Sequence, residues 1–275
     1  AIGRNAMYAN TTGTRNLAIG ALAYDASDTE NDNIAIGYGA MSENTAGGTK
    51  NIALGVYAMD ALTSADNCVG IGYAALGGTT TGGNNTGVGW SALLANSTGD
   101  SHTAFGYNAL AAVTDSTGNT GVGTNAGDAI TTGDSNTTIG YNSLTTLTTG
   151  SYNTAAGQDA LNALTTGSGN VAIGRNAGNS QTTGNYNVVI GHSAAGNNVP
   201  MTTGTNNVII GPYCDPSAVG AANQIVIGED ATGIGNNNVT LGKGHTGANR
   251  IYNDFSANAT WTHTSDERFK KDIAT

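Results

Sequence analysis

Apolar and polar positions along this chain recur at one fixed interval that is much longer than the period of a helix or a strand. The phrase NVAIG at residues 170–174 returns as NVVIG at residues 187–191. When the glycine that closes each phrase is aligned, eleven of the fourteen intervals between successive glycines are 17 residues. These closing glycines are Gly3, Gly20, Gly37, Gly55, Gly72, Gly89, Gly106, Gly123, Gly140, Gly157, Gly174, Gly191, Gly211, Gly228 and Gly242. Such a repeat is typical of a solenoid in which each repeat forms one turn.

Each place in the repeat has its own type of side chain. Alanine usually stands three residues after the closing glycine, methionine or leucine often follows it, and asparagine stands four residues before the glycine in most turns. The residue directly before the glycine is apolar in every turn, and we call this set the pre-glycine file: Ile2, Ile19, Ile36, Leu54, Ile71, Val88, Phe105, Val122, Ile139, Ala156, Ile173, Ile190, Ile210, Ile227 and Leu241. Equivalent residues should stack about 4.8 Å apart, so we expect an asparagine ladder and a core built by the pre-glycine file.

Short β-branched segments before the closing glycines predict the strands. Those at 188–190 and 225–227 are apolar throughout, which is typical of strands buried on both faces. The Thr-Thr-Gly segments at 148–150, 165–167 and 182–184 predict turns in which glycine supplies the unusual dihedral angles. A helical repeat is excluded, because glycine and β-branched residues are poor helix formers and no 3.6-residue pattern persists. We therefore predict an all-β fold, a parallel β-solenoid of about fourteen 17-residue turns over residues 1–242 and roughly 65–70 Å long.

A second surface of small residues is expected opposite the pre-glycine file. Its members in the first turns are Ala18, Ala35, Gly70, Gly87, Ala104 and Gly121. A single coil has a thin core, and small residues allow another chain to approach closely. We therefore expect a homotrimer, with the chains intertwined or side by side.

Composition and charge narrow the function classes. The chain has 42 glycines, 3 prolines and 10% charged residues, which does not fit a disordered tail or collagen. Its formal net charge is −10 and no basic cluster occurs before the last dozen residues, so we expect no nucleic-acid partner. No apolar run reaches the length of a membrane helix, so we expect no membrane insertion. The chain begins inside its own repeat, and we expect it to be a fragment or a processed product.

Candidate catalytic and metal-binding residues are few. The four histidines do not have the spacing of a metal site or a catalytic triad, and the two cysteines form no CxxC motif. Cys68 and Cys214 are about eight turns apart, roughly 40 Å at strand spacing, so they cannot form a disulfide within the chain. We expect two buried thiols, no metal site, no cofactor and no enzymatic activity toward a foreign substrate.

Two features are candidates for binding. The residue after the closing glycine is often aromatic, and an aromatic file on a fibre binds glycans by stacking or else covers the edge of the coil or a seam between chains. Its members are Tyr38, Tyr73, Trp90, Tyr107 and Tyr141. The second feature is an insertion of three residues near residues 197–201, which is either a binding surface or a tolerated loop. An ice-binding array of the Thr-Thr pairs is disfavoured, because such arrays need alternate residues on a flat face.

The repeat phrase N-T/V-A-I-G followed by small residues resembles the head repeat of trimeric autotransporter adhesins, a left-handed parallel β-roll. The longer form with Thr-Thr-Gly turns is similar to repeats of phage tail fibres. The resemblance covers residues 1 to about 242 and implies a trimeric surface fibre.

The segment TSDERFKKDIAT at residues 264–275 resembles the beginning of the endosialidase-type intramolecular chaperone domain of phage tail spikes and fibres. In that family the chaperone trimerises the fibre and then cleaves itself off at a Ser-Asp bond. The resemblance implies Ser265-Asp266 as the cleavage site, with Ser265 as the nucleophile. Residues 243–263, which have lost the repeat, are expected to form a neck.

These observations predict a structural and adhesive trimeric fibre. We expect a bacteriophage tail fibre, located in the virion tail, that binds a glycan or protein receptor on the host surface. The alternative is a trimeric adhesin on a bacterial cell surface.

Overall fold

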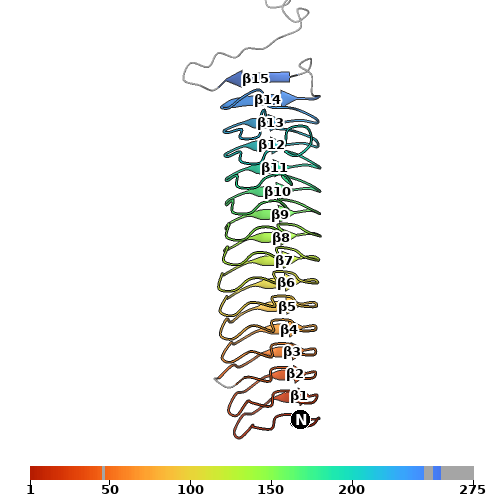
Figure 1. Cartoon of the computed structure of the whole chain (residues 1–275), viewed down its shortest axis with the longest axis vertical. Coiled ribbons are helices and arrows are strands. Elements are labelled where there is room, and N and C mark those ends of the chain that lie inside the picture. Colours follow the sequence, from red (N-terminus) through yellow and green to blue (C-terminus); the bar gives the residue numbers. More distant parts are fainter. Residues whose placement is uncertain (45–46, 245–249, 255–275) are drawn as a thin grey trace, which may run out of the picture.

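The chain forms a straight rod of stacked turns (Figure 1). The structure is a computed structural model, and it describes residues 1–44, 47–244 and 250–254. Each turn contributes one short strand, and all fifteen strands belong to one sheet in sequence order. The strands are β1 (Leu17–Ile19), β2 (Ile34–Ile36), β3 (Ile52–Leu54), β4 (Val69–Ile71), β5 (Thr86–Val88), β6 (Thr103–Phe105), β7 (Thr120–Val122), β8 (Thr137–Ile139), β9 (Thr154–Ala156), β10 (Val171–Ile173), β11 (Val188–Ile190), β12 (Val208–Ile210), β13 (Ile225–Ile227), β14 (Asn238–Gly242) and β15 (Arg250–Asp254).

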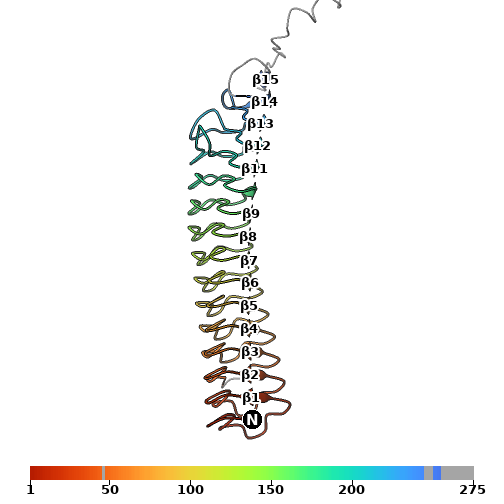
Figure 2. The same ribbon diagram turned by 90° about the vertical axis from the view of Figure 1, so that its right-hand side faces the viewer.

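Strands β1 to β14 pair in parallel and in the register that the repeat predicts. Val171 lies beside Val188, and Ile173 lies beside Ile190. The strands stack above one another, and the loops extend mainly to one side of them, with loops on both sides near the N-terminal end (Figure 2). The described residues contain no helix. The prediction of an all-β parallel β-solenoid with 17-residue turns is therefore confirmed.

The prediction of which strand residues form the core was wrong. In every strand from β1 to β13 the middle residue is buried, and the first and third residues are half-buried or exposed. The pre-glycine file therefore faces outward, and Ile139 is 45% exposed. The small residues that were expected at a chain–chain contact, such as Ala18 and Ala104, lie inside the coil. Strand 225–227 is not buried on both faces, because Ile225 and Ile227 are 37% and 38% exposed.

Large side chains from the loops decide which strand residues fit inside. A Cβ on Gly121, in the middle of β7, would lie 2.8 Å from Cγ of Leu110 in the preceding turn. In the next turn the strand residue is larger and the loop residue that packs on it is smaller. There Thr138 is the middle residue, and Gly127 takes the place of the leucine, where a Cβ would lie 3.0 Å from the methyl group of Thr138. The coil is therefore filled by compensating volumes, as close packing requires.

The glycines of the Thr-Thr-Gly segments are needed for space, which differs from the prediction. Gly150 does not have a positive φ, so the turn does not depend on an unusual dihedral angle there. A Cβ on Gly150 would lie 2.1 Å from the carbonyl oxygen of Gly167 in the next turn. A side chain at this corner would therefore push neighbouring turns apart.

An antiparallel strand covers the last turn of the solenoid. β15 pairs with β14 in the antiparallel direction, with Thr240 beside Tyr252. This strand lies within residues 243–263, which were expected to form a neck. It pairs the backbone edge that β14 would otherwise present to solvent, and free edges promote association between sheets.

Candidate functional site

The outward face of the sheet is a candidate interaction surface of the rod. Two files of side chains cover it: the pre-glycine file and the first residues of the strands, which we call the leading file. In β14, which begins one residue earlier, the leading file takes Val239, the residue paired with Ile225; the file therefore consists of Leu17, Ile34, Ile52, Val69, Thr86, Thr103, Thr120, Thr137, Thr154, Val171, Val188, Val208, Ile225 and Val239. At strand spacing the face is roughly 60 Å long and about 10 Å wide. Only the pre-glycine file is apolar along this whole length, and exposed apolar patches are typical of sites of association.

The predicted aromatic file borders this face. Tyr73 and Trp90 stack with their ring centroids 4.2 Å apart and an interplanar angle of 20°. Tyr107 and Tyr141 are 51% and 53% exposed. Because Tyr73 and Trp90 cover one face of each other, they offer less flat surface to a sugar than two separate rings would. Whether this file binds glycans or covers a seam stays a prediction.

One aromatic residue of this border, Tyr57, was missed in the sequence. Its ring makes edge contacts with Tyr38 at 5.4 Å and with Tyr73 at 6.3 Å between centroids. Tyr57 therefore links four rings in successive turns, from Tyr38 to Trp90. It stands two residues after its closing glycine instead of one, so alignment by column did not find it.

The asparagine ladder runs inside the coil, as predicted. Asn136 shows the pattern of its central turns. The side-chain oxygen of Asn136 accepts hydrogen bonds from the backbone N–H and the amide nitrogen of Asn153, at 2.9 and 3.1 Å. Its own amide donates to the carbonyl oxygen of Gly150 at 2.9 Å and to Asn119 at 3.1 Å. The ladder thereby satisfies backbone groups of the neighbouring turns that are buried away from water.

His102 and Cys68 occupy two rungs of this ladder. Nδ1 of His102 accepts from the backbone N–H of Asn119 at 3.1 Å, and Nε2 lies 2.9 Å from the carbonyl oxygen of Ser116. This arrangement requires a neutral ring with its proton on Nε2. Cys68 is fully buried, and burial raises the pKa of its thiol to about 11. Such a thiol is unreactive at neutral pH, which fits a structural role.

The burial of His102 predicts acid sensitivity. Burial lowers the pKa of His102, although the carbonyl of Ser116 and the carboxylates of Asp100 and Asp134 partly oppose this shift. The imidazole of His102 therefore binds a proton near pH 6.5 in the unfolded chain, but only at lower pH in the folded chain. The free energy of unfolding falls as the pH falls through that value. We expect His102→Asn to lose less stability than the native chain between about pH 7.5 and about pH 5.5. Urea unfolding at both pH values measures this difference, and equal losses would contradict it.

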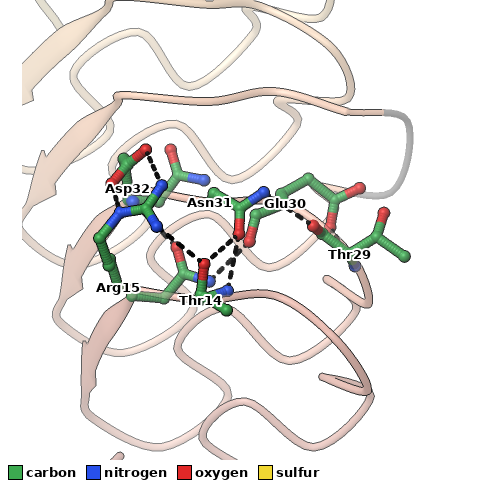
Figure 3. Close-up of polar contacts among 8 residues, drawn as sticks. Thr14, Arg15, Thr29, Glu30, Asn31 and Asp32 are labelled. Atoms are coloured by element: carbon green, nitrogen blue, oxygen red, sulfur yellow. Dashed lines mark hydrogen bonds and ion pairs between the residues drawn. The ribbon is translucent and has the colours of Figure 1, made fainter.

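A second ladder of polar contacts joins the exposed corners of the turns (Figure 3). The backbone N–H and the hydroxyl of Thr14 both donate to the side-chain oxygen of Asn31 in the next turn, each at 2.7 Å. Arg15 forms an ion pair with Asp32, and this contact lowers the pKa of the Asp32 carboxyl. Exposed ion pairs contribute little to stability, so we assign this corner a minor structural role.

The insertion near residues 197–201 is anchored to the rod. The buried carboxylate of Asp215 accepts hydrogen bonds from the backbone N–H groups of Asn197 and Asn198, at 3.0 and 2.8 Å. Met201 is fully buried. The loop projects on the side opposite the strands near β12 (Figure 2). The insertion lies away from the sheet face. That it is a binding surface, or else a tolerated loop, stays a prediction.

The absence of an enzymatic activity toward a foreign substrate stays a prediction. In the ranges 1–44, 47–244 and 250–254, groups of three or more histidine, cysteine or acidic side chains that could hold a metal ion are absent. Among these residues there is also no helix of sufficient length and hydropathy to cross a membrane. The predicted cleavage site, Ser265 and Asp266, lies outside the described residues.

Comparison with known proteins adds no relative to this picture: no family model, no curated protein and no solved structure matches the chain.

Proposed function

We propose that this chain forms the shaft of a homotrimeric adhesive fibre, and specifically a bacteriophage tail fibre that attaches the virion to its host. The observation that carries the proposal is the outward face of the sheet. Its pre-glycine file is apolar in all fourteen parallel strands and remains half-exposed in the single chain, as at Ile173, which is 42% exposed. Two further copies of the chain would cover this face.

The shape of the chain supports a mechanical role. Stacked turns of equal size make a straight rod, and three such rods side by side would be stiffer than one. A trimer also presents three copies of every exposed surface, so that weak contacts with a host glycan or protein add up by avidity. The proposal includes no catalysis on a foreign substrate, no cofactor, no nucleic-acid partner and no membrane insertion. The resemblance of the repeat to adhesin heads makes a bacterial surface adhesin the alternative, with the same assembly.

The trimer predicts a specific response to charges on the sheet face. The native chain should have a mass in solution of about three times its 27.4 kDa. We expect the double variant Ile139→Lys, Ile173→Lys to be largely monomeric, because six ammonium groups would be buried without partners in each trimer. Sedimentation velocity or light scattering measures both masses.

A matched control places the same charges at exposed positions outside the two files of the sheet face. Thr149 and Thr166 are exposed at the corners of their turns, so Thr149→Lys, Thr166→Lys should remain trimeric. A native chain that is monomeric at all concentrations would contradict the proposal. Adhesion itself is tested by incubating labelled native fibre with a panel of bacterial cells. Absence of binding to every envelope type would contradict the adhesive role while leaving the trimer intact.

A further inference from the structure

The leading file of the sheet face changes its chemistry along the rod. It is apolar in β1–β4, consists of threonine in β5–β9, and is apolar again in β10–β14. The threonine block comprises Thr86, Thr103, Thr120, Thr137 and Thr154, all of them half-buried. Within the residues that the structure describes, none of these five hydroxyls makes a hydrogen bond inside its own chain.

Other threonines of the rod behave differently. Those in the file that begins the Thr-Thr-Gly corners donate to a carbonyl oxygen of the next turn, as Thr131 does to Thr148 at 3.1 Å and Thr148 does to Thr165 at 3.1 Å. Threonine in this fold can therefore bond to a neighbouring turn. The hydroxyls of the threonine block lack partners because of their position on the outward face. They point away from the coil at the surface that the proposed trimer would cover.

Covering an apolar face alone would not fix how far neighbouring chains are shifted along the rod. Because successive turns are nearly identical, a shift by one turn, about 4.8 Å, leaves most apolar contacts in place. The threonine block removes this degeneracy. A one-turn shift would place Val69 of one chain level with Thr86 of its neighbour, and Thr154 of the first chain level with Val171 of the neighbour. A hydroxyl that is buried without a hydrogen bond is unfavourable, whereas hydroxyls at equal levels can bond to one another or share water.

We propose that the threonine block fixes the axial register between copies of this chain, so that Thr86 to Thr154 lie at equal levels in all protomers. This inference rests on the proposed trimer. Equal levels allow three chains to close into a ring. A shift repeated at each seam cannot close and produces a staggered open assembly. The threonine block would act as a single buried asparagine does in a coiled coil, where a polar residue specifies register.

A second copy of the chain fits this surface better than an unrelated partner does. The hydroxyls recur once per turn over five turns, and a partner must offer polar groups with the same spacing between two apolar segments. The chain itself meets this requirement, including the longer interval between Gly191 and Gly211 that a partner in equal register would share.

The test replaces the block by valine, which the leading file already contains in β10, β11 and β12. The native chain should give one discrete trimer. For the variant Thr86→Val, Thr103→Val, Thr120→Val, Thr137→Val, Thr154→Val, we expect more than half of the material to leave the trimer peak. Light scattering should show a broad range of larger masses, and electron microscopy should show particles longer than the native rod.

The control variant carries five equal substitutions away from the face: Thr81→Val, Thr98→Val, Thr132→Val, Thr149→Val and Thr166→Val, all at exposed positions. It should remain a discrete trimer. If the first variant does not fold, as judged by circular dichroism, alanine at the same five positions (Thr86→Ala, Thr103→Ala, Thr120→Ala, Thr137→Ala, Thr154→Ala) should show the same loss, because it also removes all five hydroxyls.

Two other outcomes would overturn the inference. A trimeric native chain whose valine variant stays equally discrete would overturn the register role and leave the proposed function standing. A monomeric native chain would overturn both proposals. Inhibition of ice growth by such a monomer would then identify ordered water as the occupant of the face.

Discussion

Replacing Gly106 by alanine is expected to destabilise the middle of the rod strongly. Gly106 has a φ of +140°, which side chains of L-residues rarely adopt, and a Cβ there would lie 2.4 Å from the carbonyl oxygen of Gly123. The clashing atom belongs to the backbone of the next turn, so no side-chain rotation relieves it. Backbone strain and overpacking together should lower the free energy of unfolding by about 3–5 kcal/mol per chain. Denaturant unfolding followed by circular dichroism measures this loss.

Gly118→Ala separates the two causes. Gly118 has a positive φ of +68°, but its nearest neighbour to an added Cβ is the Ser135 hydroxyl at 3.5 Å, an ordinary contact. We expect this variant to lose only about 1 kcal/mol, the cost of a left-handed alanine. Equal losses for the two variants would show that close approach between turns is unimportant. A trimer would contain the change three times, so the Gly106→Ala effect should be larger in the assembly.

The period in the sequence was sufficient to predict the path of the backbone. Equal spacing of chemically equal residues allows one arrangement in which all columns stack, and the observed register, Ile173 beside Ile190, is that arrangement. The asparagine ladder was predictable for the same reason. Stacked amides inside a coil have donors and acceptors at one-turn spacing, and the observed contacts between Asn136 and Asn153 use both.

The two faces of the strands were not predictable from hydrophobicity alone. Each face of the strands carries an uninterrupted file of side chains. One face has mostly isoleucine and the other mostly alanine or glycine, and the larger side chains were expected to form the core. The interior is filled instead by loop residues such as Leu110, which leave room only for a small residue in the strand. The sequence does contain a signal for this. Where the loop residue is small, as at Gly127, the strand residue becomes larger, as at Thr138.

The candidate surface was predicted in part. The aromatic file was found because it occupies one column, whereas Tyr57 stands outside that column and contacts its neighbours only in three dimensions. A role for the threonine block can be inferred only because the leading file faces outward. A threonine that faces the interior can bond only within its own chain, as Thr138 does to the carbonyl oxygen of Ser143 at 2.9 Å. A threonine that faces outward leaves its hydroxyl for solvent or for another chain.

Replacing Asn136 by leucine should have the second large effect. The leucine has the same branched arrangement of side-chain heavy atoms, with methyl groups somewhat larger than the amide groups, but it can neither accept from the backbone N–H of Asn153 nor donate to the carbonyl oxygen of Gly150. Both groups would then be buried without partners, and each such group costs about 1–3 kcal/mol. We expect the free energy of unfolding to fall by about 3–5 kcal/mol per chain, measured by urea unfolding.

Histidine at the same position provides the matched comparison. His102 occupies a rung of the ladder in the native chain and uses one ring nitrogen as acceptor and the other at hydrogen-bond distance from a carbonyl oxygen. Asn136→His should therefore retain the backbone contacts at neutral pH and lose clearly less stability than Asn136→Leu. Its stability should also fall more steeply in acid, because a buried imidazole must remain neutral to accept a hydrogen bond. If leucine and histidine were equally tolerated, the rod would depend on the volume of the ladder residues and not on their hydrogen bonds.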